Sequence, residues 1–142
     1  MKIYADTSVL VAWFHPADHF AAPVTDWSRA RGPDFHWNSL LRGELRHNLR
    51  KLSGDYAAVA WQAYRASESA RRLVPARERV SDILEWADEL SARFAAETPC
   101  GTWDCAHVAA ALHTKADVFA TCDVAQARLA KLARMPEIKL FK

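Results

Sequence analysis

Four acidic residues stand where the surrounding sequence does not favour an acid. Asp6 and Asp123 each follow a short β-prone run and precede an apolar helical one, while Glu44 and Asp104 interrupt apolar helical faces. Four carboxylates gathered at one place would repel one another unless divalent cations lay among them. Oxygen ligands select Mg²⁺ or Mn²⁺, and such ions promote the hydrolysis of phosphodiesters. The pattern therefore predicts a metal-dependent hydrolase.

Glu44 and Asp104 are unusual because of the helices that carry them. At about 100° per residue, the leucines that follow Leu40 in segment 40–52 span an arc of about 180°, and Glu44 falls inside that arc. Asp104 belongs to a helix that is apolar almost all round (TWDCAHVAAALH). A buried carboxylate without a partner is costly, so each acid needs a metal ion or an arginine. For Asp6 and Asp123, the alternative is a plain helix N-cap.

The elements that must position these acids alternate between strand and helix. Strands are expected at 2–5, 35–37, 73–75, 117–121 and 138–141. Helices are expected at 9–14, 18–29 (ended by Gly32-Pro33), 40–52, 55–72, 81–97, 103–114 with Thr102 as cap, and 124–132. This alternation predicts one α/β domain over residues 1–142, with a short, mainly parallel sheet flanked by helices. Asp6 and Asp123 then lie at the carboxyl ends of strands, where such sheets bind ligands.

The overall composition is typical of a folded globular protein. The 142 residues are 51% hydrophobic and 25% charged, and no apolar run reaches the ~20 residues of a membrane span or forms an export signal. Three cysteines form no CxxC pair, and their odd number fits a reducing cytoplasm better than a disulfide framework. Cys100, Cys105 and His107 do not have the spacing of a common zinc module. The 19 basic and 17 acidic residues give a net charge of +2. If bound metal neutralised four of the acids, 13 acidic residues would remain against 19 basic ones, and the resulting charge of +6 would suit a polyanionic partner.

Four sequence segments, in this order and spacing, resemble the PIN-domain nucleases over nearly the whole chain: IYADTSVLVAW, SLLRGELRHNL, WDCAHVAAAL and FATCD. The compact length resembles the VapC-like toxins of type II toxin–antitoxin systems. The resemblance implies a three-layer PIN-like fold, Mg²⁺- or Mn²⁺-dependent cleavage of RNA, a homodimer and inhibition by a small antitoxin protein. It also implies that Asp6, Glu44, Asp104 and Asp123 are the metal-binding and catalytic acids, and that Thr121 is a substrate-binding neighbour.

Two features depart from the family pattern. The turn at 113–116 (HTKA) lacks the glycine often found there, which affects the expected loop geometry. Other acids offer alternative site residues, although their spacing fits solvated helix faces: Glu68, Asp82, Glu85 and Asp88.

Several further residues allow two interpretations. His107 follows Asp104 by three positions, so it could bond that carboxylate or contact substrate, or it could be a packed core histidine. Basic residues around Glu44 could steer phosphate groups or form an ordinary solvated face: Arg42, Arg46, His47, Arg50 and Lys51. Six tryptophans exceed what a small core usually needs, which suggests an interface and supports the homodimer.

Two other functions remain as alternatives to a ribonuclease toxin. A PIN-like domain that had lost catalysis would act as a binding module, although all four acids are present here. A metal-dependent phosphatase would share the acids but should enclose its small substrate in a pocket.

Overall fold

A parallel sheet of five short strands organises the chain, whose computed structural model describes residues 1–32 and 34–142. The strands are β1 (Lys2–Ala5), β2 (Asp34–Trp37), β3 (Leu73–Pro75), β4 (Val118–Thr121) and β5 (Glu137–Leu140). Their order in the sheet is β3-β2-β1-β4-β5, and all four pairings are parallel. The five strands expected from the sequence and the parallel sheet are confirmed.

The two central strands consist almost wholly of apolar residues because both faces of the sheet are covered. β1 and β4 pair with Ile3 opposite Val118 and Tyr4 opposite Phe119, and these four side chains are fully buried. Such continuous apolar runs are typical of parallel strands that lie between two layers of helices. After β1 the chain first builds β2 and β3 on one side, and it then places β4 and β5 on the other. The carboxyl ends of β1 and β4 therefore flank the point where the strand order reverses, which is where open α/β sheets bind ligands.

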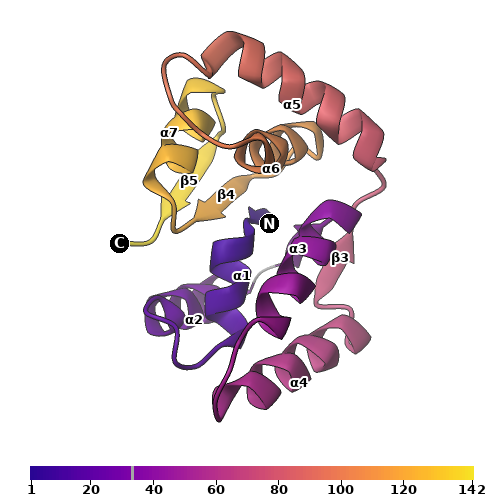
Figure 1. Cartoon of the computed structure of the whole chain (residues 1–142), viewed down its shortest axis with the longest axis vertical. Coiled ribbons are helices and arrows are strands. Elements are labelled where there is room, and N and C mark those ends of the chain that lie inside the picture. The colour runs from indigo at the N-terminus through magenta and orange to yellow at the C-terminus, as the bar shows by residue number, and fades with distance from the viewer. Residues whose placement is uncertain (33) are drawn as a thin grey trace.

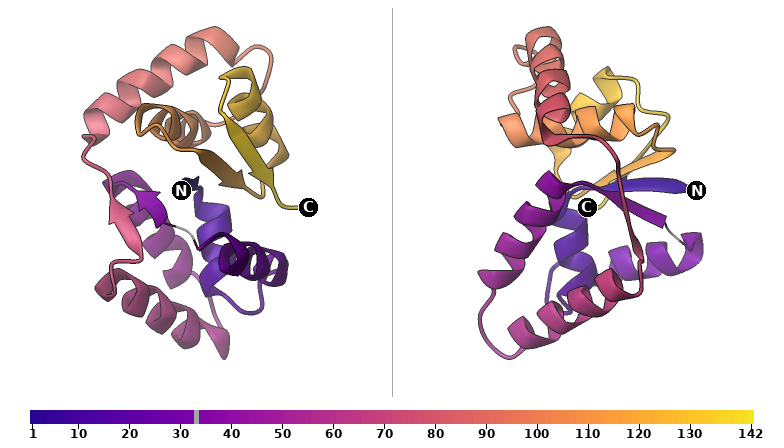
Figure 2. Two further views of the ribbon diagram at one scale, coloured as in Figure 1. Left: turned by 180° about the vertical axis from the view of Figure 1, so that it is seen from behind. Right: turned by 90° about the vertical axis from the view of Figure 1, so that its right-hand side faces the viewer.

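Seven helices in the described part of the chain form the two outer layers. They are α1 (Thr7–Phe14), α2 (Ala21–Arg31), α3 (Ser39–Arg50), α4 (Tyr56–Ser69), α5 (Val80–Phe94), α6 (Thr102–His113) and α7 (Val124–Leu132). Figure 1 shows α1 to α4 on one side of the sheet and α5 to α7 on the other. The side view in Figure 2 shows the sheet between these layers, so the predicted three-layer α/β fold is confirmed.

The helix ends agree with the sequence signals to within about three residues: α2, expected at 18–29, spans Ala21–Arg31, and α4 and α5, expected to end at 72 and 97, end at Ser69 and Phe94. Gly32 ends α2 in the left-handed conformation (φ 55°), while Pro33, the second residue of the predicted stop, lies outside the described residues. α6 begins one residue earlier than expected, with Gly101 rather than Thr102 at the N-cap. The reason is that the Asp104 carboxylate accepts a hydrogen bond from the Gly101 N–H at 2.9 Å, which satisfies a donor that helix formation leaves free.

Helix α3 holds Glu44 at the edge of the core. It buries Leu41, Leu45 and Leu49, as the leucine pattern predicts, and Glu44 is half-buried beside them. Asn38 caps the helix by accepting the Leu41 N–H at 2.8 Å. None of the helices in residues 1–32 and 34–142 is long and apolar enough to cross a membrane.

Candidate active site

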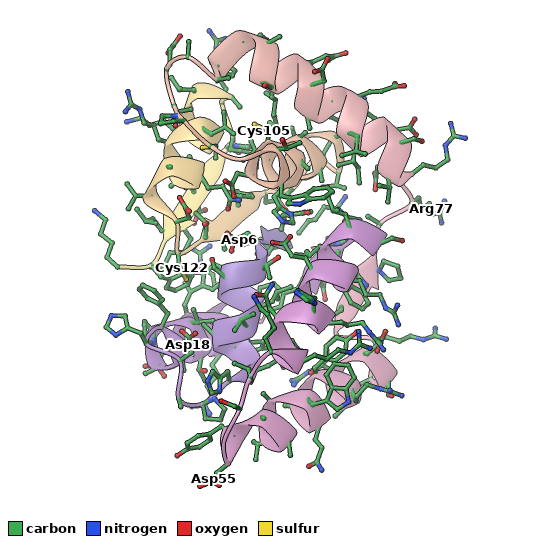
Figure 3. The ribbon with its side chains drawn as sticks, in the orientation of Figure 1. Asp6, Asp18, Asp55, Arg77, Cys105 and Cys122 are labelled. Carbon is green, nitrogen blue, oxygen red and sulfur yellow. The ribbon has the colours of Figure 1, made fainter. Side chains whose placement is uncertain are left out.

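Asp6 lies at the carboxyl end of β1, and its side chain is only 4% exposed. Its Oδ1 accepts hydrogen bonds from the Val9 N–H at 3.1 Å and from the Ser8 hydroxyl at 2.6 Å. Its Oδ2 accepts the Thr121 hydroxyl at 2.7 Å. Figure 3 shows Asp6 between the two helical layers. The residue is therefore an N-cap, as one interpretation predicted, and it also occupies the switch point of the sheet.

No lysine or arginine among the described residues forms a salt bridge with Asp6. Burial raises the pKa of the Asp6 carboxyl, and the hydrogen bonds from Ser8, Thr121 and Val9 offset only part of that rise. An ionised carboxylate in such a place is costly, and a divalent cation would supply the missing charge. The oxygen donors at this position fit Mg²⁺ or Mn²⁺.

A continuous set of hydrogen bonds connects three of the predicted acids. The Thr121 hydroxyl, which donates to Asp6, accepts the N–H of Asp123 at 2.9 Å. Asp123 caps α7, because its Oδ1 accepts the N–H of Gln126 at 2.9 Å. The side chain of Gln126 then donates from Nε2 to Asp104 Oδ1 at 3.0 Å. Thr121 thus links Asp6 with Asp123, and Gln126 links Asp123 with Asp104.

Asp104 lies in the first turn of α6 and is only partly buried. Its carboxylate accepts bonds from Gly101 and Gln126, and no lysine or arginine of the described chain forms a salt bridge with it. The alternative of a structural acid paired with an arginine is therefore not met among these residues. The amino end of α6 provides a favourable potential for this anion.

Glu44 lies on α3, and its side-chain partner is His107. Glu44 Oε2 lies 2.7 Å from His107 Nε2, and the histidine is only 2% exposed. Burial alone would raise the pKa of Glu44, but the interactions with His107, and to a smaller extent with Thr7, outweigh it and lower that pKa. Of the interpretations that the sequence left open for His107, the structure agrees with a packed core histidine and shows no bond to Asp104, whose oxygens accept from Gly101 and Gln126. The imidazole instead bridges Glu44 and Tyr4.

Three of the four acids are connected through Thr121 and Gln126, Glu44 is bonded to His107 instead, and the four are not gathered into one cage. Within residues 1–32 and 34–142, no three His, Cys, Asp or Glu side chains lie close enough to share an ion. Asp6 is buried, Glu44 and Asp104 are partly exposed, and Asp123 is exposed. Thr121 is fully buried, and its hydroxyl serves the two aspartates, so its contact with substrate stays a prediction.

The sequence model of the PIN domain matches residues 3–132, which is nearly the entire chain. The chain belongs to the PIN domain family. PIN domains are nucleases, so the acidic edge of the sheet lies on a protein of a nucleic-acid-cleaving class.

Solved structures share the fold of this PIN domain at low sequence identity. VapBC2 from Rickettsia felis, bound to a DNA fragment from its promoter, matches with a TM-score of 0.65 and 13% identity over 100% of both chains. FitAcB from Neisseria gonorrhoeae matches with a TM-score of 0.62 and 17% identity over 100% of this chain and 97% of that one. FitAB bound to an IR36 DNA fragment matches with a TM-score of 0.63 and 18% identity over 99% of this chain and 94% of that one. A comparison with curated proteins gave no significant match.

Two polar residues of this PIN domain escaped the sequence analysis. Ser8 donates to Asp6 and accepts the Cys122 N–H at 3.1 Å, so it joins the ends of β1 and β4. Gln126 is 2% exposed and holds Asp104. A signal for Gln126 existed, because it follows Asp123 by the three-residue spacing of a capping box. Instead of bonding back to the N-cap of α7, the Gln126 side chain bonds to Asp104 of α6.

The alternative acids are engaged elsewhere in the PIN domain. Glu68 of α4 pairs with Arg42 at 2.9 Å and with Arg46 at 3.8 Å. Asp82 of α5 lies 3.4 Å from Arg79. Glu85 and Asp88 are exposed on α5, as their helical spacing predicts. Two of the basic residues around Glu44 therefore already have an acidic partner.

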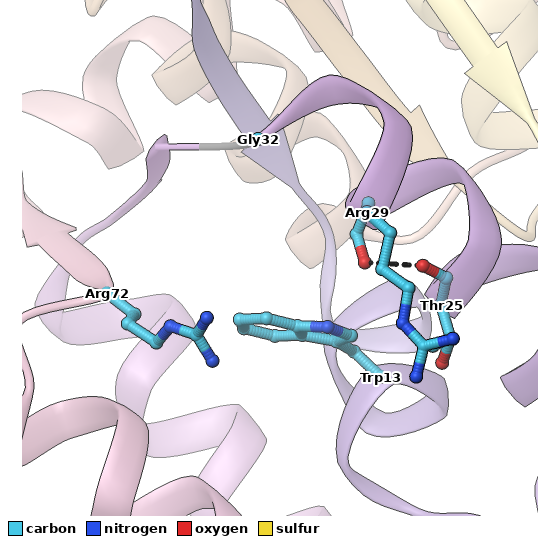
Figure 4. Close-up of a pocket in the computed structure, with 6 residues that line it drawn as sticks. Trp13, Thr25, Arg29, Gly32 and Arg72 are labelled. Atoms are coloured by element: carbon cyan, nitrogen blue, oxygen red, sulfur yellow. Dashed lines mark hydrogen bonds between the residues drawn. The ribbon is translucent and has the colours of Figure 1, made fainter.

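Two hollows on the surface of the PIN domain meet at Glu44. One of about 380 Å³ also touches Ser8 and Asn48, and the other, of about 420 Å³, runs beside Leu40 and Trp103. A third hollow of about 410 Å³ has no acid among its lining residues: Trp13, Thr25, Ser28, Arg29, Gly32 and Arg72. Figure 4 shows the Trp13 indole between the two arginines of that third hollow. Only the first two adjoin the predicted acids.

Proposed function

We propose that this PIN domain is a Mg²⁺- or Mn²⁺-dependent endoribonuclease and the toxin of a type II toxin–antitoxin pair. The observation that carries the proposal is the state of Asp6, a buried carboxylate held by neutral donors alone at the switch point of the sheet. A stable fold tolerates such an anion when a cation completes its surroundings. The links from Asp6 to Asp123 and Asp104 extend the acidic site toward the surface.

The residues at the proposed site have two kinds of role: some bind the metal ion, and others orient the side chains that bind it. Asp6, Glu44, Asp104 and Asp123 would hold the metal ion, with Asp6 and Asp104 as its principal ligands. The bound ion supplies a Lewis acid and a water of lowered pKa for phosphodiester hydrolysis. Ser8 and the other donors to Asp6 fix its carboxylate, and Gln126 fixes that of Asp104, so both acids keep one orientation. Each carboxylate oxygen has more than one lone pair, so these bonds leave acceptor capacity for a cation.

The solved relatives support the proposed biological setting. VapBC2 and FitAB were solved with DNA, in the first case with a fragment of the promoter of the pair. By analogy, the partner of this chain is a small antitoxin that binds DNA and inhibits the nuclease. A homodimer and a cytoplasmic location complete the proposal, and all three cysteines are free thiols, which suits a reducing compartment.

The test compares the cleavage of RNA and of a small phosphoester, with Mg²⁺ or Mn²⁺ and with EDTA. We expect metal-dependent cleavage of RNA alone, lost in Asp6→Asn. A matched control is Asp117→Asn, because Asp117 precedes β4 at the opposite edge of the sheet, where it accepts the Lys2 N–H. Turnover of the phosphoester alone would favour a phosphatase. A wild type that cleaves neither substrate would favour a binding module.

A further inference from the structure

A chain of buried hydrogen bonds runs beneath the acidic site and ends on Glu44. Asn38 Nδ2 lies 3.0 Å from the Tyr4 hydroxyl, which lies 3.0 Å from His107 Nδ1. His107 Nε2 lies 2.7 Å from Glu44 Oε2. Asn38, Tyr4 and His107 are each no more than 4% exposed. Three polar side chains in a core of this size need a reason, because each must be fully bonded to be tolerated.

The direction of every bond in this chain follows from one backbone group. The Leu41 N–H can only donate, so the Asn38 atom that it meets at 2.8 Å is the acceptor Oδ1. The other amide atom of Asn38 is then Nδ2, which can only donate, and it faces the Tyr4 oxygen. The Tyr4 hydroxyl accepts that bond, and its one other partner among the described residues is His107 Nδ1. The buried hydroxyl hydrogen is therefore satisfied only if it is donated to Nδ1.

The same reasoning fixes the tautomer of His107. Because Nδ1 accepts the Tyr4 hydrogen, the imidazole carries its proton on Nε2, which donates to Glu44 Oε2. One oxygen of Glu44 is thereby held by the core. Asn38 also caps α3, the helix that carries Glu44, so one side chain fixes both the helix and the chain of donors.

We propose that His107 is a positioning residue that aims the Glu44 carboxylate at the bound metal ion, with its tautomer and ring orientation set by Tyr4 and Asn38. The inference rests on the proposed metal-dependent nuclease but assigns a role that the four acids alone do not include. Side chains that orient metal ligands commonly change metal affinity by about 10–100-fold when they are removed. This set of hydrogen bonds predicts a loss of metal affinity of about that size when His107 is replaced. It predicts a smaller loss when Tyr4 is replaced, because Tyr4 does not touch Glu44.

The first test needs neither metal nor RNA. Nitrogen NMR of the ¹⁵N-labelled protein, with His107 assigned by its loss in His107→Gln, reports which ring nitrogen carries the proton. We expect a protonated Nε2 and an Nδ1 that accepts a hydrogen bond, and we expect Tyr4→Phe to shift the Nδ1 signal toward that of an unbonded nitrogen. Tyr64→Phe is the matched control, because it removes another buried tyrosine hydroxyl, 3.5 Å from Arg46. A proton on Nδ1 in the wild type would overturn the inference.

The second test measures Mn²⁺ affinity by titration calorimetry. His107→Leu should weaken binding by about tenfold or more, and His107→Gln, whose amide can still donate to Glu44, should recover part of the loss. Tyr4→Phe should weaken binding less than His107→Leu, and Tyr64→Phe should equal the wild type. If Tyr4→Phe does not fold, the pair of His107 variants makes the same comparison.

The outcomes separate this inference from the proposed function. A wild type that binds Mn²⁺ and cleaves RNA, with His107→Leu binding Mn²⁺ equally well, would refute the positioning role alone. A wild type that binds no Mn²⁺ would refute the metal site, and the positioning role with it.

Discussion

Replacing Asp104 by asparagine removes the charge of the side chain while keeping its shape, and the structure indicates how the variant would be accommodated. The oxygen of the new amide can still accept the Gly101 N–H, but its nitrogen then faces Gln126 Nε2, which is also a donor. Gln126 Oε1 is buried without a partner among the described residues. A half-turn of the Gln126 amide presents this oxygen to the new nitrogen, so the number of hydrogen bonds is preserved.

The expected cost of Asp104→Asn in free energy of unfolding is small. Exchanging charged for neutral hydrogen bonds costs about 1 kcal/mol, and losing an anion at the start of a helix costs about 0.3–1 kcal/mol. The variant also loses the repulsion between Asp104 and the other acids, which offsets part of this destabilisation. The metal-free variant should therefore be less stable by about 1–2 kcal/mol at most. An aspartate that neutralised a buried arginine would cost about 3–5 kcal/mol.

Activity should fall far more than stability in this variant. A lost metal ligand should reduce RNA cleavage by more than the 10–100-fold typical of groups that only support ligands. The assay pairs urea melts in EDTA with RNA cleavage in Mg²⁺, with Asp117→Asn as the control at the opposite edge of the sheet. The reasoning fails if Asp104→Asn loses more than about 3 kcal/mol while its folded fraction still cleaves RNA at the wild-type rate.

Four further outcomes are expected. Burial raises the pKa of Asp6, so its protonated form is favoured in the folded protein. The resulting contribution to the free energy of unfolding is present at low pH and is lost as the pH rises through that raised pKa. Metal-free Asp6→Asn should thus be more stable than the wild type at pH 7 and lose this advantage in acid; urea melts giving the same difference at both pH values would contradict this. Mn²⁺ at 100 times its Kd should stabilise the wild type by about 2.7 kcal/mol in thermal melts, and an equal gain in Asp6→Asn would exclude Asp6 as a ligand. Burial raises the pKa of Cys122 to about 11, so iodoacetamide at pH 8 should label this thiol slowly until urea is added; mass spectrometry showing equal rates would argue against the buried position. Light scattering at tens of micromolar, above a dissociation constant of ~10 µM, should give the mass of a dimer, and a monomeric mass would remove that proposal.

The sequence predicts the fold well because the signals for its elements are local. Apolar runs such as 118–121 identify central strands without knowledge of their neighbours, and the leucines of α3 define a buried face that includes Glu44. Asp6 and Asp123 could be placed at one edge of the sheet because parallel strands bring their carboxyl ends together. Those inferences need only the periodicity of the apolar residues and the order of the predicted strands along the sequence.

The hydrogen-bond partners within the site could not be predicted in the same way. His107 shares a helix with Asp104 but bonds Glu44, which lies 63 residues away in sequence. Gln126 likewise joins an acid 22 residues before it. Such choices depend on how three helices pack around the sheet, and spacing within one helix carries no information about them. Asn38 or Ser39 could serve as the cap of α3 on sequence alone, but the second bond of Asn38, to Tyr4, depends on the pairing of β1 with β2.

The central place of β1 has a consequence for the timing of activity in a newly synthesised chain. β1 is synthesised long before its neighbour β4, which begins at Val118, and the donor that holds Asp6 Oδ2 is Thr121. Gln126, which orients Asp104, is made later still. A growing chain that stops before β4 can contain β1, β2 and β3, but it lacks Asp123 and the side chains that hold Asp6 Oδ2 and Asp104 Oδ1. The proposed metal site is therefore incomplete in such a chain, which we expect to lack the proposed nuclease activity.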